Sequence, residues 1–396
     1  MSMSERIIDI HQKYVIPTYA PELLLVRGEG NYVWDADGNK YLDFLAGISV
    51  LNVGHCHPKV VRAIQEQAGK LMHVSNLYYN EKQPQLARML SERSMGGKCF
   101  FCNSGAEANE GLIKLARLWG GDRGRYEVVT MRNSFHGRTL ATLTATGQTK
   151  VQKGFAPLPE GFVLADFNDI ASCRAAITKK TAAILVEAVQ GEGGILPADP
   201  VFMSELRALC DQEDILMLCD EVQAGMGRTG KWFAFQNYDV EPDAFSMAKA
   251  LGSGFPIGAI VTNSRTADVL QPGSHATTFG GTPLACTAAL ATIEVIEEEH
   301  LLQNAREMGI ALLDGLKKIE EDYDFAITAR GAGLMVGLVL DRPAKELQTG
   351  MQERGVLALA TAGNVLRMLP PLNINENQVK QALKAVADSC EAIKNA

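Results

Sequence analysis

The central part of the chain alternates short apolar runs with helical or glycine-rich segments. Between about residues 58 and 285, apolar runs of strand length lie at 127–131, 162–165, 182–187, 215–219, 244–247 and 257–261. Buried parallel strands typically read as continuous hydrophobic runs, and strands that alternate with helices indicate crossover connections. The pattern therefore predicts an α/β region with a mostly parallel sheet and helices on both faces.

Helical periodicity is clear at two places. Val61, Ile64, Ala68 and Leu71 share one face of a segment that begins after Pro58. Near the end of the chain, a helix is predicted to begin at Asn375, with its apolar face formed by Val379, Leu383, Val386, Cys390 and Ile393.

The two ends of the chain differ from the middle. Short strand-like pieces at 32–34 and 40–42 flank a turn at Asp35–Gly38, and long helical patterns follow residue 283 before alternating strands near 325–340. We expect the ends to fold together into a smaller domain. The predicted division is 1–57 and 286–396 for the small domain, and 58–285 for the large one.

Composition and charge narrow the class of protein. The chain has 396 residues, of which 46% are hydrophobic and 21% charged, as in ordinary globular proteins. The net charge of −8 and the lack of basic runs argue against nucleic acid as a partner. No signal peptide and no apolar window of membrane length are visible, so we expect a cytoplasmic protein. Cys99 and Cys102 are the only close pair among its eight cysteines and have no second pair to accompany them, so we expect reduced thiols and no metal.

A carboxylate and a lysine each follow a predicted strand. Asp220 comes after the run 215–219, and Lys249 comes after the run 244–248. Parallel strands would bring both to the carboxyl edge of the sheet, where α/β proteins bind ligands. Pyridoxal phosphate needs a lysine to hold its aldehyde as a Schiff base and an acid to keep its ring nitrogen protonated. Acids and lysines at strand ends are common, however, so this pair alone leaves an ordinary structural role open.

An anion site is predicted at the start of a helix. Ser104, Gly105 and Ala106 follow the apolar run 99–102 and precede leucines at helical spacing. Small residues there let backbone N–H groups approach a phosphate, although an ordinary capped helix would look the same. The run Gly225–Gly230 also fits a dinucleotide or P-loop pattern, but Trp232 stands where the P-loop needs a hydroxyl.

Several longer strings occur together in one order: NSGAEANE, FHGRT, VQGEGG, DEVQAGMGRTG, the context of Lys249, and HATTFGGTPLA. As a set they resemble the class III, fold-type I pyridoxal phosphate-dependent aminotransferases, over nearly the whole chain. The stretches LDFLAGISVLNVGHCHP and HVSNLYYN are similar to the acetylornithine aminotransferase branch. The resemblance implies a large domain with a mostly parallel seven-stranded sheet, and a smaller α+β domain built from both termini.

The resemblance also implies roles for individual residues around the cofactor. Lys249 would carry the cofactor and move protons, while Asp220 would bind the ring nitrogen. Thr278 would reach the phosphate in the neighbouring subunit, so a homodimer is expected. Ser104, Gly105 and Ala106 would cradle the phosphate. Gln223 would bind the ring hydroxyl side. Phe135 and Val222 would contact the two faces of the ring.

Substrate contacts follow from the charges of the expected substrates. Arg138 would grip the distal carboxylate, and Arg367 the carboxylate next to the reacting amine of glutamate. By resemblance, Glu192 would close on Arg367 when a donor with an ω-amine binds; a permanent Glu–Arg ion pair is the alternative. Tyr19 resembles a tyrosine at the pocket edge, in a segment one residue shorter than usual.

The expected reaction is transfer of the δ-amine of N2-acetylornithine to 2-oxoglutarate, giving N-acetylglutamate 5-semialdehyde and glutamate in arginine biosynthesis. Ile48 stands where ornithine aminotransferases tend to carry a tyrosine, which favours an acylated donor. Succinylornithine, ornithine, 4-aminobutyrate and acylated lysine-pathway amines remain alternatives. A pyridoxal phosphate mutase or decarboxylase, or a non-catalytic protein that binds the cofactor, is a more distant one.

Overall fold

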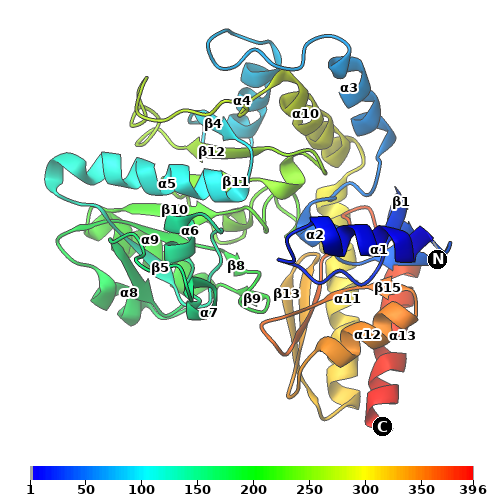
Figure 1. Cartoon of the computed structure of the whole chain (residues 1–396). Helices are drawn as coiled ribbons and strands as arrows, with labels where there is room; N and C mark the ends of the chain where they lie inside the picture. Colours follow the sequence, from blue (N-terminus) through cyan, green and yellow to red (C-terminus); the bar gives the residue numbers. More distant parts are fainter. Residues whose placement is uncertain (1–2, 396) are drawn as a thin grey trace.

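The computed structural model describes residues 3–395, and a seven-stranded sheet forms the centre of its larger part (Figure 1). All pairings are parallel except those of β12, which runs antiparallel to both neighbours. The order across the sheet is β4 (Cys99–Cys102), β12 (Gly258–Thr262), β11 (Ala244–Met247), β10 (Leu216–Asp220), β7 (Thr181–Val186), β5 (Glu127–Met131) and β6 (Phe162–Ala165).

Helices cover both faces of this sheet, which is why its strands are apolar along their whole length. Helix α5 (Gly105–Gly120) crosses one face, while α8 (Ile170–Ala176) and α9 (Pro200–Gln212) cover the other (Figure 1). Every residue of β7, β10, β11 and β12 is buried. The mostly parallel sheet predicted from the apolar runs is confirmed, and its strands lie within a residue or two of the predicted bounds.

Two four-stranded sheets and three helices form the smaller part. One sheet has the order β1 (Leu25–Glu29), β2 (Tyr32–Asp35), β3 (Lys40–Asp43), β15 (Val356–Leu357). The other has the order β13 (Ala326–Ala332), β14 (Met335–Leu340), β17 (Val365–Met368), β16 (Leu359–Thr361). The helices are α11 (Leu301–Asp322), α12 (Lys345–Glu353) and α13 (Glu376–Lys394).

The pairing of β3 with β15 joins the two ends of the chain in one sheet. This confirms that a smaller α+β unit is built from both termini. Asn375 caps α13 by accepting from Gln378 N, so the predicted start of the last helix is correct. Pro58 likewise opens a helix, α3 (Pro58–Ala68), whose cap His57 accepts from Lys59 N.

Further helices and short elements connect the two parts. Helices α3 and α4 (Lys82–Glu92) pack against α10 (Pro283–Glu298), which is continuous across the predicted boundary at 285/286. The hairpin β8 (Val189–Gln190) and β9 (Leu196–Pro197) extends from the large sheet. The remaining short elements are α2 (Ala46–Ser49), α6 (Leu140–Ala145), α7 (Thr149–Gln152) and the 3₁₀ turns Gly121–Arg123, Ala234–Asn237 and Lys249–Leu251.

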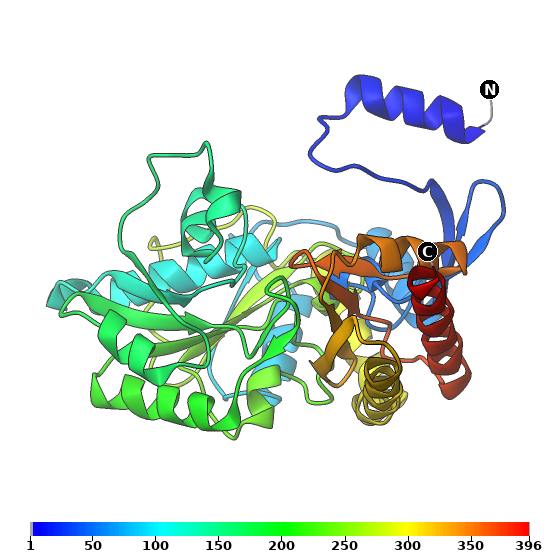
Figure 2. The ribbon, with the colours of Figure 1, turned by 90° about the horizontal axis from the view of Figure 1, so that it is seen from below.

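The N-terminal helix α1 (Met3–Tyr14) buries none of its residues and stands apart from the body of the chain (Figure 2). It is amphipathic, with Ile8 and Ile10 each 44% exposed. Within residues 3–395, no helix is both long and apolar enough to cross a membrane.

Candidate active site

Asp220 and Lys249 lie at the carboxyl ends of two neighbouring parallel strands, at the same edge of the large sheet. Asp220 ends β10 and is in register with Ser246 of β11, three residues before Lys249. Both side chains line a cavity of about 390 Å³, within the usual size range for small-ligand sites. The predicted meeting of an acid and an amine at the carboxyl edge is therefore present in the fold.

The carboxylate of Asp220 is buried and held by three donors. Its Oδ2 accepts from Asn109 Nδ2 at 2.7 Å and lies 2.8 Å from His136 Nδ1, while its Oδ1 accepts from Val222 N at 3.0 Å. Ser246 Oγ in turn donates to Asn109 Oδ1 at 2.6 Å. These contacts orient the buried carboxylate and satisfy its oxygen atoms through a side-chain amide, an imidazole and a backbone N–H, rather than through an arginine or lysine.

Lys249 sits in an unusual backbone conformation directly after β11. Its φ of 43° lies in the left-handed region, which costs a non-glycine residue energy. Burial lowers the pKa of its amine to about 8, with Arg367 acting in the same direction and Glu192 opposing it. An amine with this pKa is mostly neutral, and so nucleophilic, above about pH 8 rather than only above its ordinary value of about 10.5.

The first turn of α5 supplies an anion site on the cavity wall. Ser104 caps the helix, and its hydroxyl accepts from Glu107 N at 3.2 Å. The N–H groups at a helix start have no partners within the helix, so those of Gly105 and Ala106 are available to a phosphate. A Cβ at Gly105 would lie 2.6 Å from Val222 Cγ1, so a larger residue there would clash with the turn after β10.

Two side chains that follow large-sheet strands shape the rest of the cavity. Phe135 comes after β5 and Val222 after β10, and both line the cavity. The amide of Phe135 donates to Glu187 Oε2 at 3.1 Å. Burial, with the nearby charge of Asp220, raises the pKa of Glu187 well above its ordinary value.

Arg367 is fully buried on β17, and side chains from the turn after β8 and from the turn after β10 reach it. Its Nη1 donates to Glu192 Oε1 at 2.5 Å and to Gln223 Oε1 at 3.1 Å. Burial opposes ionisation of Glu192, but Arg367 outweighs it and the pKa of Glu192 lies below its ordinary value. Arg367 Nε and Nη2 are buried and have no hydrogen-bond partner among the described residues. A guanidinium with two free N–H groups suits a carboxylate ligand.

The remaining predicted residues lie at different distances from the cavity. Arg138 is exposed at its wall, with its guanidinium 5.1 Å from the centre of the Phe135 ring. Tyr19 is 85% exposed and lines a separate hollow beside α1. Thr278 is exposed and lines a further hollow with Ser75 and Phe100. A single chain therefore brings Arg138 to the site but leaves Tyr19 and Thr278 outside it.

The side chains that are present fit pyridoxal phosphate. The cofactor needs an amine for its aldehyde, an acid for its ring nitrogen and donors for its phosphate. The cavity offers Lys249, Asp220 and the start of α5 for these three tasks, each from a different element. No cluster of three metal-ligating side chains was found among residues 3–395.

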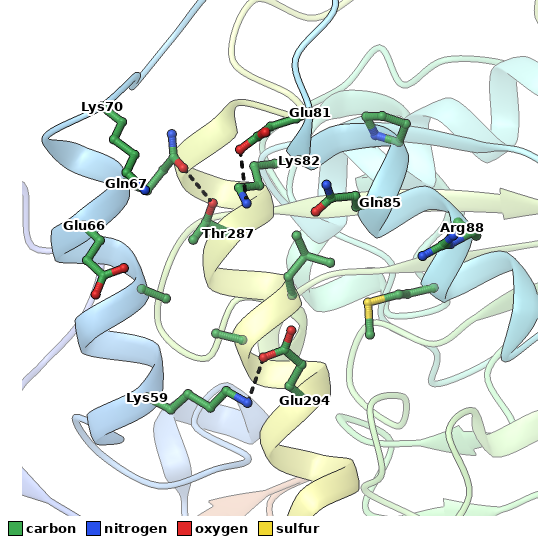
Figure 3. A pocket seen from close by; sticks show the side chains of 15 residues that line it. Lys59, Glu66, Gln67, Lys70, Glu81, Lys82, Gln85, Arg88, Thr287 and Glu294 are labelled. Atoms are coloured by element: carbon green, nitrogen blue, oxygen red, sulfur yellow. Dashed lines mark hydrogen bonds and ion pairs between the residues drawn. The ribbon is translucent and has the colours of Figure 1, made fainter.

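A larger hollow of about 800 Å³ lies elsewhere, between α3, α4 and α10 (Figure 3). Charged side chains of both signs line it, and Lys59 pairs with Glu294 at 2.8 Å. None of the predicted site residues contributes to its walls. This hollow is larger than the cavity lined by Asp220 and Lys249, but the acid and the amine suited to the cofactor line only the smaller cavity.

Three residues of the site were not singled out from the sequence. Glu187 directly follows β7, so the signal that identified Asp220, a carboxylate at a strand end, applied to it as well. Asn109 and Ser246 gave no such signal, because a polar residue in a helix or strand is usually exposed. Their contact with each other depends on how α5 packs against β11.

Comparison with known proteins agrees with the fold. The family described as "Aminotransferase class-III" matches residues 15–389, and the chain belongs to this family of pyridoxal phosphate-dependent enzymes. The chain is 50% identical to the acetylornithine aminotransferase of Methanocaldococcus jannaschii, over 98% of this chain and 99% of that protein. It is 43% identical to the succinylornithine transaminase of Yersinia enterocolitica, over 96% and 95%.

Solved structures place the fold in the same family. The ornithine aminotransferase of Toxoplasma gondii superposes with a TM-score of 0.96 at 32% identity, over 100% of this chain and 96% of that one. That structure has pyridoxal phosphate at partial occupancy in its active site. The protein is thus an aminotransferase, and the fold class and cofactor predicted from the sequence are confirmed.

Proposed function

We propose that this aminotransferase moves the δ-amine of N2-acetylornithine to 2-oxoglutarate, in the synthesis of arginine. The structural observation that carries the proposal is Arg367, a buried cation whose partner Glu192 sits on a turn beside the cavity. Such a site can offer a free cation to glutamate and a neutralised one to a donor with an ω-amine. The acyl preference draws on the relatives named acetylornithine aminotransferase.

The cofactor supplies an electron sink that makes the carbon next to the substrate nitrogen acidic. Lys249 Nζ has a pKa of about 8 and is neutral above that pH. It is the group that takes up and returns the proton at that carbon. Asp220, fixed by Asn109 and His136, favours a protonated ring nitrogen. Phe135 and Val222 would bound the ring on its two faces, and Gln223 would bind the ring hydroxyl side.

Recognition of both substrates is assigned to the two arginines. Arg138 grips the carboxylate far from the reacting carbon, which both substrates carry. Arg367 grips the second carboxylate of glutamate or 2-oxoglutarate, using N–H groups such as Nε and Nη2 that have no partner among residues 3–395. With an ω-amine donor that second carboxylate is absent, and Glu192 compensates the charge of Arg367. Tyr19 is proposed at the pocket edge, brought there by assembly.

The decisive experiment is absorbance spectroscopy of the pyridoxal phosphate-loaded enzyme mixed with single amines and no keto acid. N2-acetylornithine should convert the cofactor to its amino form fastest, and 2-oxoglutarate should reverse the change. An equal or faster response to ornithine or 4-aminobutyrate would discard the proposed donor. No response to any amine would support a non-catalytic protein, and Lys249→Ala is the control that should lose turnover.

Succinylornithine is the second candidate donor, because relatives named succinylornithine transaminase are 43% identical over nearly the whole chain. Its acyl group lies away from the reacting carbon, so the catalytic residues would be the same. The ratio of kcat/KM for the two acylated donors separates these candidates. A ratio well below one for acetylornithine over succinylornithine would transfer the assignment to the second.

We propose that the active unit is a homodimer in which Thr278 contacts the phosphate in the neighbouring subunit. Thr278 lies outside its own chain's cavity, and large exposed side chains such as Leu77, Tyr78, Tyr79 and Phe279 mark the same region. Light scattering should give twice the chain mass of 42.9 kDa. Thr278→Ala should weaken cofactor retention without changing that mass, and a monomer with full activity would contradict the proposal.

Two further proposals concern location and domains. The net charge of −8 and the biosynthetic role suit a cytoplasmic enzyme.

The small domain is assigned to residues 1–57 and 286–396, and the large one to 58–285, with α10 crossing the second boundary. Cell fractionation tests the first proposal, and limited proteolysis tests the second by the position of the first cuts.

A further inference from the structure

The turn that carries Glu192 is held by the small-domain sheet. Residues 191–195 connect β8 to β9, a hairpin that follows β7 of the large sheet. Strand β9 packs against β13 (Figure 1), and Thr361 at the end of β16 donates to the carbonyl of Glu192 at 3.4 Å. The position of Glu192 therefore depends on contacts from elements that are distant in sequence.

Arg330 makes the best-defined of these contacts. It lies on β13, and its Nε and Nη2 donate to the carbonyl oxygen of Gly194 at 3.1 and 2.8 Å. No carboxylate in the described chain forms an ion pair with it, and burial lowers its pKa. A half-buried cation whose partner is a neutral carbonyl adds little to stability, because its desolvation is poorly compensated. The two N–H groups instead fix the direction of the Gly194 carbonyl.

The turn has little freedom to move around that contact. Gly194 has a φ of 98°, and a Cβ there would lie 3.1 Å from Val365 Cγ2 and 3.2 Å from Arg330 Nη2. Ile195 is fully buried with a φ of 55°, a conformation that costs a β-branched residue energy unless its surroundings impose it. The end of the turn is thus a strained segment held in place by the small domain.

We infer that Arg330 is a positioning residue that holds the turn 191–195 so that Glu192 stays on Arg367, and that it thereby sets the preference between ω-amine donors and glutamate. The inference rests on the proposed role of Glu192. A closed Glu192 favours the ω-amine donor, and a displaced one favours glutamate. Loss of the Arg330 contact should therefore lower the kcat/KM of the half-reaction with the ω-amine donor and leave that of the half-reaction with glutamate nearly unchanged. A merely structural role would lower both values together.

The test compares Arg330→Met and Arg330→Lys with the matched control Arg354→Met. Arg354 also donates to backbone carbonyls, those of Gly350 at 2.9 Å and Asp388 at 3.2 Å, but it joins α12 to α13. Single-turnover kcat/KM of the holoenzyme is measured with glutamate and with the best ω-amine donor that the parent enzyme accepts. Arg330→Met should lose about tenfold with the donor and stay within about twofold with glutamate. Arg330→Lys should fall between, and Arg354→Met should match the parent.

A double-mutant cycle identifies the route of the effect. In a Glu192→Ala background the turn has no carboxylate to position, so adding Arg330→Met should leave the ratio of the two half-reactions unchanged. If Glu192→Ala itself leaves the ratio unchanged, the proposed closing of Glu192 on Arg367 (the Glu192 gate) is wrong. If Glu192→Ala shifts the ratio and Arg330→Met does not, the gate stands and the assignment of Arg330 is overturned.

Hydrogen exchange provides a readout that needs no turnover. Amides of residues 191–196 should exchange faster in Arg330→Met than in the parent and in Arg354→Met. Unchanged exchange there would show that Arg330 does not hold the turn, whatever the kinetics. Equal losses in both half-reactions would likewise overturn the inference.

Discussion

Glu192 Oε1 lies 2.5 Å from Arg367 Nη1, although Glu192 is on the turn between β8 and β9, Arg367 is on β17, and 175 positions separate them in sequence. Arg367 is fully buried on β17, while the Glu192 side chain keeps 28% of its surface exposed. One partner of the pair is thus fixed and the other stands at the edge of solvent. A pair of this kind can open by movement of the glutamate alone.

We expect Glu192→Gln to shift substrate preference by about tenfold or more toward glutamate. The neutral amide leaves Arg367 uncompensated when an ω-amine donor binds, and an unpaired buried charge costs about 2–3 kcal/mol. Glutamate brings its own carboxylate and no longer has to displace Glu192. The two half-reactions are measured separately by absorbance. A parallel loss in both would favour the permanent ion pair over the gate.

Arg138→Ala is expected to raise KM for both substrates, because the carboxylate far from the reacting carbon is common to both. Loss of a bidentate contact predicts a drop in kcat/KM of about tenfold to a hundredfold. Arg138→Lys should restore only part of this, since an ammonium lacks the planar fork. A change confined to one substrate would show that Arg138 serves only one of the two.

The rate at which the apoenzyme captures pyridoxal phosphate should rise with pH around a midpoint near 8. Burial lowers the pKa of Lys249 to about 8, so the reactive neutral amine forms as the pH passes that value rather than at about 10.5. Stopped-flow absorbance at several pH values measures the rate, with Lys249→Ala as the control that removes the signal. A midpoint at the ordinary lysine value would show that the amine is not desolvated.

Arg228→Ala is expected to destabilise the fold by about 3 kcal/mol or more. The guanidinium is fully buried and donates to Ser49 Oγ at 2.9 Å, to Asn52 Oδ1 at 2.5 Å and to the carbonyls of Leu334 and Pro370. The truncation leaves these acceptors unsatisfied and adds a cavity. Urea unfolding measures the change in free energy.

The exposed Arg342 pairs with Asp341 on the surface of the small domain, so Arg342→Ala provides the comparison. It should change the free energy of unfolding by less than about 1 kcal/mol. Equal effects of the two substitutions would mean that the contacts of Arg228 contribute nothing beyond an ordinary surface arginine.

Local pattern determined much of the architecture and the first half of the site. Continuous apolar runs specify buried parallel strands, and residues at the ends of such strands are carried to one edge of the sheet, which is why Asp220 and Lys249 could be paired in advance. The same local logic located the start of α5 and the cap of α13, because capping depends on residues only a few positions apart.

Only the tertiary structure decided which distant groups surround those residues. The chain of contacts from Ser246 through Asn109 to Asp220, the hold of Arg330 on Gly194 and the enclosure of Arg228 all join segments far apart in sequence. Such contacts have no period or spacing, because they follow from how the sheets and helices pack. Sequence thus determined the elements and the reactive groups, while packing decided their partners, burial and pKa values.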